Sequence, residues 1–64
     1  MSERDQVLAL VEKLRDAAKK LCETGNTSDA KRCELVAHNI AHEEDTTLEE
    51  AQVMCSVALR EQIS

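Results

Sequence analysis

Aromatic residues and proline do not occur in this sequence, and glycine occurs once. None of the 64 residues is Phe, Tyr, Trp or Pro, and Gly25 is the single glycine. Without the large apolar areas that aromatic rings bury, a core must be built from many close contacts between smaller side chains. Tight hairpin turns need residues that tolerate a positive φ, which one glycine supplies at one place only. Because good helix formers such as Ala, Leu, Glu and Lys are frequent, the composition favours helices over sheets.

Long apolar runs are also missing. No stretch approaches the ~20 consecutive apolar residues of a membrane-spanning helix. The segment 1–5 is too polar to be the apolar part of a signal peptide. We therefore expect a cytoplasmic protein with no membrane partner.

The three cysteines are Cys22, Cys33 and Cys55, an odd number without CxxC spacing. A secreted disulfide framework normally has an even number of cysteines. All three lie on stretches where apolar residues recur, and there a reduced cysteine acts as a small apolar side chain. We predict that all three are buried, reduced and intracellular.

Motifs for catalysis are absent from the sequence. It contains no glycine-rich phosphate loop and no GxSxG nucleophile motif. A buried thiol away from a base is inert, and a chain this short has little room for both a core and a ligand pocket. We expect no enzymatic activity and no cofactor.

Apolar residues recur with helical spacing in three segments. The spacing predicts helices over about 2–24, 28–42 and 48–62. Ser2 is a suitable N-cap for the first helix, and Gly25 is placed to end it. The apolar face of the first helix comprises Val7, Val11, Leu14, Ala18 and Leu21, flanked by Leu10, Ala17 and Cys22. The second helix has Ala30, Cys33, Val36, Ala37, Ile40 and Ala41 on one face. The third has Leu48, Ala51, Met54, Cys55, Ala58, Leu59 and Ile63.

An acidic segment separates the second and third helices. Five of the ten residues 43–52 are acidic, namely Glu43, Glu44, Asp45, Glu49 and Glu50. Carboxylates are favourable near a helix N-terminus and unfavourable near a C-terminus. In addition, Thr47 and Glu50 have the spacing of a capping box. The segment therefore predicts a turn followed by a helix start.

These patterns predict a single all-α domain over residues 1–64. The short first connection makes the first two helices an antiparallel hairpin, to which the third helix adds. A domain of this size buries only about 60% of the surface of its unfolded chain, which leaves it marginally stable alone. We therefore expect a three-helix unit that forms a homodimer. The three helices either close into a bundle, or the first helix serves as the long arm of the dimer.

Charge is unevenly distributed along the chain. Residues 1–32 carry seven basic and six acidic side chains, and residues 33–64 carry one basic and seven acidic ones. The net charge of −5 is unfavourable for nucleic-acid binding, and no aromatic ring accompanies the cations for base stacking. A basic region opposite an acidic one can orient two subunits or steer a charged partner. The basic residues around the first connection are Lys13, Arg15, Lys19, Lys20, Lys31 and Arg32.

Four large apolar residues lie away from the apolar faces of the helices. They are Leu8, Leu35, Val53 and Val57, and the two valines are one helical turn apart. Single exposed apolar residues are common on soluble proteins. Four in a chain of 64 indicate a second apolar surface, which we interpret as a subunit or partner interface.

Glu34, His38 and His42 follow one another at intervals of four residues. Two imidazoles at this spacing on a helix can share a metal ion. The sequence has Asn39 where an HExxH motif has glutamate, and no second carboxylate–histidine pair occurs. A solvated helix face with His42 near a helix C-terminus explains the same residues.

Three functional hypotheses follow from these patterns. The leading one is a small intracellular helical regulator without catalytic activity, which binds itself and another protein. The first alternative is an acidic mimic of nucleic acid that inhibits a DNA-binding protein through Glu43, Glu44, Asp45, Glu49 and Glu50. The second alternative is a helical metal-binding protein that uses His38 and His42.

Overall fold

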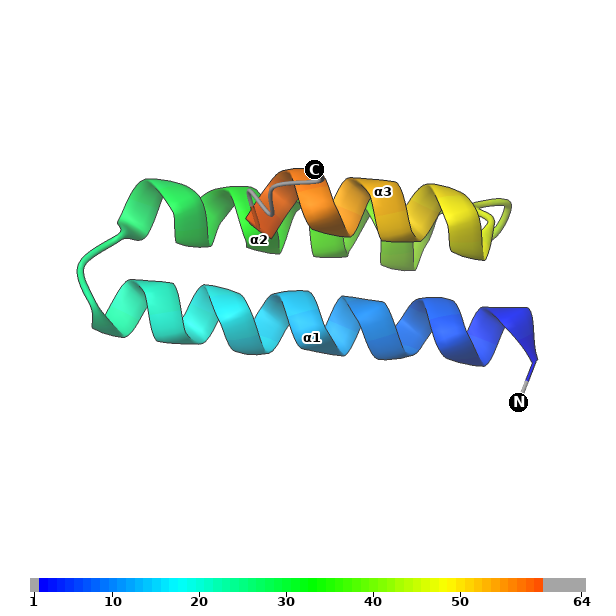
Figure 1. Ribbon diagram of the computed structural model, residues 1–64, viewed down its shortest axis with the longest axis horizontal. Coiled ribbons are helices and arrows are strands. Elements are labelled where there is room, and N and C mark those ends of the chain that lie inside the picture. The colour runs from blue at the N-terminus through cyan, green and yellow to red at the C-terminus, as the bar shows by residue number, and fades with distance from the viewer. Residues whose placement is uncertain (1, 60–64) are drawn as a thin grey trace.

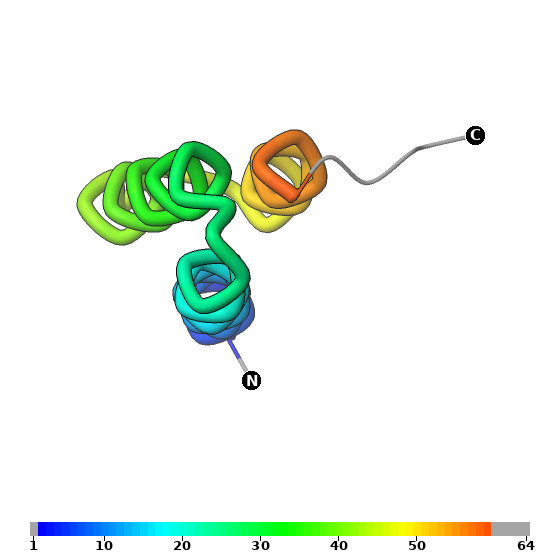
Figure 2. Tube along the Cα trace, turned by 90° about the vertical axis from the view of Figure 1, so that its left-hand side faces the viewer, coloured from blue at the N-terminus to red at the C-terminus, as the bar shows by residue number. Residues whose placement is uncertain are grey.

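The computed structural model describes residues 2–59, and this part of the chain forms three α-helices. They are α1 (Glu3–Glu23), α2 (Thr27–His42) and α3 (Leu48–Leu59). α1 and α2 run antiparallel, and α3 turns back beside α2 (Figure 1). Seen end on, the three helices form a triangle in which each one contacts the other two (Figure 2). The prediction of an all-helical unit built on an antiparallel hairpin is confirmed, while residues 60–62 of the predicted third helix lie outside the described part.

Both ends of α1 are capped by the residues that the sequence indicated. The Asp5 N–H donates to Ser2 Oγ at 3.2 Å, and the Ser2 N–H donates to Asp5 Oδ2 at 3.4 Å. This reciprocal pair is a capping box. At the other end, Gly25 has a φ of 88°, and its N–H donates to the Cys22 carbonyl at 3.2 Å. The Asn26 N–H donates to the Leu21 carbonyl at 2.8 Å, which completes a Schellman motif.

The second helix begins without a side-chain cap. α2 starts at Thr27, one residue before the predicted position, with Asn26 as its N-cap residue. Asn26 makes no side-chain hydrogen bond to the helix, and its amide instead donates to Thr24 Oγ1 at 3.1 Å. The Asn26 side chain therefore supports the turn at the end of α1 rather than the start of α2.

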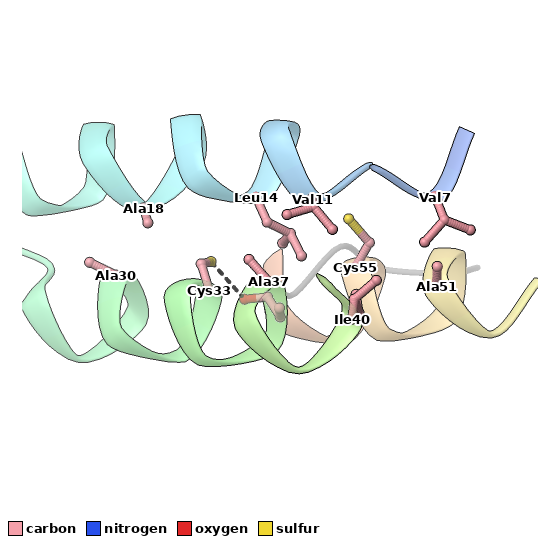
Figure 3. Packing of buried hydrophobic residues seen from close by; sticks show 11 residues of the cluster. Val7, Val11, Leu14, Ala18, Ala30, Cys33, Ala37, Ile40, Ala51 and Cys55 are labelled. Atoms are coloured by element: carbon pink, nitrogen blue, oxygen red, sulfur yellow. Dashed lines mark hydrogen bonds between the residues drawn. The ribbon is translucent and has the colours of Figure 1, made fainter. Parts of the chain in front are cut away.

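The core lies between the three helices and is made of small aliphatic and sulfur side chains (Figure 3). Its largest fully buried side chains are Leu14, Ile40, Val7 and Cys33. The third helix contributes only three small residues, Ala51, Cys55 and Ala58. The small residues let the helix backbones approach closely, and Cys33 Sγ donates to the Ala58 carbonyl oxygen at 3.6 Å. The full set of buried apolar residues is Val7, Val11, Leu14, Ala18, Ala30, Cys33, Ala37, Ile40, Ala51, Cys55 and Ala58.

One prediction about the core is wrong, because Cys22 is exposed. Cys33 and Cys55 are buried as predicted. Cys22 lies in the last turn of α1, at the edge of the apolar stripe, where the chain already turns toward α2. Position at the end of a helix therefore outweighs the apolar pattern for this residue.

Two charged residues in the first turn of α1 hold the connection between α2 and α3. Arg4 Nη2 donates to the Ala41 carbonyl oxygen at 2.8 Å, and Nη1 donates to that of Glu43 at 3.3 Å. Next to it, Glu3 Oε2 accepts a hydrogen bond from the Leu48 N–H at 3.2 Å. A cation thus meets the C-terminus of α2 and an anion meets the N-terminus of α3, the signs that the helix dipoles favour.

None of the helices within residues 2–59 combines the length and the apolar character that crossing a membrane requires.

Candidate interaction surface

The four apolar residues that lie off the helix stripes are exposed, as predicted. The exposed fractions are 39% for Leu8, 62% for Leu35, 55% for Val53 and 66% for Val57. Leu8 is the least exposed of the four and lies on α1, whereas the other three lie on α2 and α3.

α2 and α3 lie side by side and share an outer side that faces away from α1 (Figure 2). On each of these helices, half-buried residues flank the buried stripe on two sides, one toward α1 and one toward the neighbouring helix. In α2, Ala41 borders α1, because its carbonyl binds Arg4, so the half-buried Val36 on the opposite border lies toward α3. In α3, Leu59 lines a groove shared with α1, so the half-buried Met54 on the opposite border lies toward α2.

The positions of the exposed residues on this side follow from the positions of Val36 and Met54. Successive residues of an α-helix are turned by about 100°, so Leu35 lies further out than Val36 on α2. In the same way, Val53 and Val57 lie further out than Met54 on α3. We call these five residues, Leu35, Val36, Val53, Met54 and Val57, the α2–α3 outer surface. Leu8 does not belong to it, because α1 lies on the other side of the α2–α3 pair (Figure 2).

The contact between Cys33 and Ala58 shows which residues of α2 and α3 lie at the same level along the bundle axis. Leu35 follows Cys33 by two residues and Val57 precedes Ala58 by one. Because α2 and α3 run in opposite directions, both steps lead toward the same end of the bundle (Figure 1). At a rise of about 1.5 Å per residue, Leu35 and Val57 therefore lie at nearly the same height.

A shallow depression marks one end of the α2–α3 outer surface. Its volume is about 370 Å³, and it is lined by Glu49, Glu50, Val53 and Met54. It is open to solvent and lies entirely on α3. The depression suits the side chain of a macromolecular partner better than a small molecule, which normally needs an enclosed pocket.

The acidic side chains of residues 43–52 are exposed, although Thr46 and Ala51 in the same segment are buried. Glu43, Glu44, Asp45, Glu49 and Glu50 are all exposed and lie around the α2–α3 connection. The predicted capping role of Thr47 is confirmed, since its Oγ1 accepts the Glu50 N–H at 3.1 Å. The adjacent Leu48 N–H is bound by Glu3 of α1, which sequence spacing could not indicate.

His38 and His42 lie against each other on the exposed side of α2. Their ring centroids are 4.1 Å apart, with an angle of 43° between the ring planes. Within residues 2–59, no three His, Cys, Asp or Glu side chains are placed to hold a metal ion together, so Glu34 does not complete a site with the histidines. The metal-binding hypothesis therefore rests on the two imidazoles and stays a prediction, which metal analysis of untagged protein tests.

The two buried thiols serve packing in this structure. Burial raises the pKa of the Cys33 thiol above its usual value, and the nearby Asp29 carboxylate raises it further, against a smaller opposing effect of Arg32. Cys55 Sγ lies 3.9 Å from the Leu10 carbonyl oxygen, to which it donates. A thiol whose ionisation is disfavoured in this way is a poor nucleophile at neutral pH.

Comparison of the chain with protein-family models, with curated protein sequences and with solved structures finds no match.

Proposed function

We propose that this protein is a non-catalytic helical interaction module, and that it acts through the α2–α3 outer surface. The observation that carries the proposal is the exposure of Leu35, Val53 and Val57, which are 62%, 55% and 66% exposed. The core already holds the apolar stripes of all three helices, so these residues are not needed for folding of the single chain. An apolar surface beyond the core is typical of a binding site.

The partner that we propose first is a second copy of the chain. Burying an exposed Val or Leu side chain is favourable by roughly 1.5–3 kcal/mol, so three such residues per copy offset much of the cost of association. A dimer would also add apolar burial to a domain whose core has no aromatic side chain. A different protein with an apolar face would compete for the same surface.

Replacement of both valines by aspartate tests the proposal. We expect Val53→Asp/Val57→Asp to be a folded monomer, because the charges disrupt the contact and both positions are exposed in the single chain. Light scattering measures the mass. Circular dichroism shows whether the variant is still helical and whether its melting temperature changes. Gln52→Asp is the matched control, since Gln52 is exposed on α3 and lines the groove toward α1. A double variant with unchanged mass and melting temperature contradicts the proposal.

Co-purification from the native host tests whether the surface binds a protein other than a second copy of the chain. We expect a protein captured by the wild type to be lost with Val53→Asp/Val57→Asp and kept with Gln52→Asp. A protein captured equally by both variants binds elsewhere, which contradicts the assignment of this surface.

A mimic of nucleic acid is a second candidate function, favoured by the exposure of all five acids around the α2–α3 connection. In this case the carboxylates would take the place of phosphates on a DNA-binding protein. Binding through charges falls steeply between low and moderate salt, because counterions screen it. Binding through Val53 and Val57 should change little over the same range, so a salt titration of the captured complex distinguishes the two functions.

A further inference from the structure

The two ends of the bundle differ in the sign of their charge. Residues 13–32, which include the end of α1 and the start of α2, carry six basic and three acidic side chains, a net charge of +3. The other described residues, 2–12 and 33–59, carry one basic and nine acidic side chains, a net charge of −8. Five of these nine acids surround the α2–α3 connection, at the opposite end of the bundle (Figure 1). A partner of this bundle therefore meets a basic end and an acidic end.

The α2–α3 outer surface extends from one edge of the helix pair to the other. Val36 lies on the side of α2 toward α3, and Met54 lies on the side of α3 toward α2. Leu35 is turned by about 100° from Val36, away from the core, so it lies at the edge of α2 that is distant from α3. Val53 is turned by the same angle from Met54 and lies at the edge of α3 that is distant from α2. Leu35 and Val53 thus mark opposite edges of the surface.

The contact of Cys33 with Ala58 gives the centre of this surface along the bundle axis. Counted in residues from the contact toward the acidic end, the five residues lie at one (Val57), two (Leu35), three (Val36), four (Met54) and five (Val53). The centre of the surface is therefore level with Val36. Val53 and Val57 lie two residues from this level on opposite sides of it, whereas Leu35 lies only one residue away.

Two copies that meet face to face through this surface have a two-fold axis in the plane of contact. An axis along the helices keeps the copies parallel and puts α2 of each copy on α3 of the other. Ends of like charge then meet, which electrostatic repulsion disfavours. An axis across the helices makes the copies antiparallel and puts α2 on α2 and α3 on α3. The basic end of each copy then faces the acidic end of the other, so charge complementarity favours this axis.

We infer that two copies of this chain pair antiparallel about a two-fold axis that crosses α2 and α3 at the level of Val36. This inference rests on the proposed function and adds the orientation of the pair. Leu35 then meets Leu35 of the second copy, because it lies close to the axis and rotation about that axis keeps it at the same edge. Val53 meets Val57 of the second copy, since the two valines lie at equal distances on opposite sides of the axis. A two-fold contact is made twice, so the dimer has two such valine contacts.

Disulfide cross-linking of introduced cysteines tests the orientation. The background is Cys22→Ser, because Cys22 is exposed whereas Cys33 and Cys55 are buried. We expect Leu35→Cys in this background to give a cross-linked dimer under mild oxidation, because the two introduced thiols face each other near the axis. A disulfide needs Cβ atoms about 4 Å apart, so residues at opposite edges of the surface do not form one.

An equimolar mixture of Leu35→Cys and Val57→Cys distinguishes the two axes. In the antiparallel pair these residues lie on different, non-facing helices, so we expect no mixed disulfide. In a parallel pair the result is reversed, because α2 then faces α3 of the other copy and Leu35 and Val57 lie at nearly the same height. Mass spectrometry of the intact dimers identifies the mixed species, since the two variants differ in mass. Circular dichroism verifies that each variant is folded.

Leu8→Cys in the same background is the control, because Leu8 is 39% exposed on α1, away from the α2–α3 outer surface. It should give no cross-linked dimer. A mixed disulfide in place of the Leu35→Cys dimer overturns the antiparallel orientation while the proposed function stands. A chain that dimerises in sedimentation equilibrium but forms neither disulfide overturns the orientation as well. A wild-type chain that stays monomeric at all concentrations overturns the proposed self-association together with the orientation.

Discussion

The guanidinium of Arg4 donates a hydrogen bond to the carbonyl oxygen of Ala41 at 2.8 Å, although 37 positions separate the two residues in the chain. Arg4 lies in the first turn of α1 and Ala41 in the last turn of α2. The last carbonyls of a helix have no partner within the helix, so a cation that reaches them provides both a hydrogen bond and a favourable interaction with the helix dipole. This contact, with that of Glu3 to Leu48, ties the beginning of the chain to the α2–α3 connection.

Loss of the Arg4 side chain should destabilise the fold. We expect Arg4→Ala to lower the free energy of unfolding by about 1–2 kcal/mol, since two carbonyl groups lose a charged hydrogen-bond donor. Urea denaturation followed by circular dichroism measures the change. Arg15→Ala is the control, because Arg15 is exposed in the middle of α1. Equal effects of the two substitutions would show that the contacts with Ala41 and Glu43 contribute nothing in solution.

Glu3 should protect the start of α3. We expect Glu3→Ala to cost about 0.5–1 kcal/mol, because the Leu48 N–H loses an acceptor and the N-terminus of α3 loses an anion. Glu3 also lies in the first turn of α1, so stability alone does not separate its two roles. Amide hydrogen exchange of Leu48 does so, and it should accelerate in Glu3→Ala. An unchanged exchange rate at Leu48 would assign the lost stability to α1.

The three cysteines should differ in reactivity toward alkylating reagents. We expect iodoacetamide to modify Cys22 in the folded protein and to reach Cys33 and Cys55 only after unfolding, because these two are buried. Mass spectrometry of the intact protein and of its peptides identifies the modified residues. The Cys22→Ser variant should show no rapid modification under native conditions, and rapid labelling of that variant would contradict the burial of the other two.

Stability should decrease at alkaline pH because of the Cys33 thiol. Burial raises the pKa of this thiol above its usual value, so the folded state holds the proton more tightly than the unfolded state. The contribution of the protonated thiol to stability is fully present below the pKa of the unfolded state, about 8.5, and is lost as the pH rises through the pKa of the folded state. Urea denaturation at a series of pH values should show this decrease in the wild type and a smaller one in Cys33→Ala. The same slope in both would exclude Cys33 as its cause.

Among these substitutions, shortening of Leu14, the largest buried side chain, should lower the free energy of unfolding most. Leu14 is fully buried among the three helices, so we expect Leu14→Ala to cost about 2–5 kcal/mol through lost burial and a residual cavity. For a domain this small, that loss approaches the total stability. Leu8→Ala is the control, because Leu8 is 39% exposed on the same helix. Thermal melts of both variants compare the two positions, and similar melting temperatures would contradict the described core.

Most of the secondary structure could be predicted from local patterns. The N-cap role of Ser2 and the positive φ of Gly25 depend on residues that are neighbours in the chain, so the sequence alone indicates them. The apolar stripes predicted the buried faces, because a helix with a fixed period presents the same residues wherever it packs. For the same reason, the exposure of Leu35, Val53 and Val57 could be predicted before their surroundings were known.

The failures occurred where the outcome depends on which elements meet. Cys22 shares the periodicity of the stripe, but the last turn of α1 leaves it exposed. Nothing in the spacing of Glu3 and Arg4 indicates that they bind Leu48, Ala41 and Glu43, since those partners lie far along the chain. An acid and an arginine in the first turn of a helix are common, and only the position of the neighbouring helix ends gives them these contacts.

The sequence by itself determined three amphipathic helices, their turns and the residues left off the apolar faces, because each of these depends on interactions within a few residues. Tertiary structure decided how these parts are combined. The contact of Cys33 with Ala58 marks the register of α2 and α3, and in that register Leu35 and Val57 lie at nearly the same height, while Leu8 lies on α1. The physical reason is that helical period specifies the direction of a side chain around its own axis, whereas packing of the small core residues specifies the position of one axis against another.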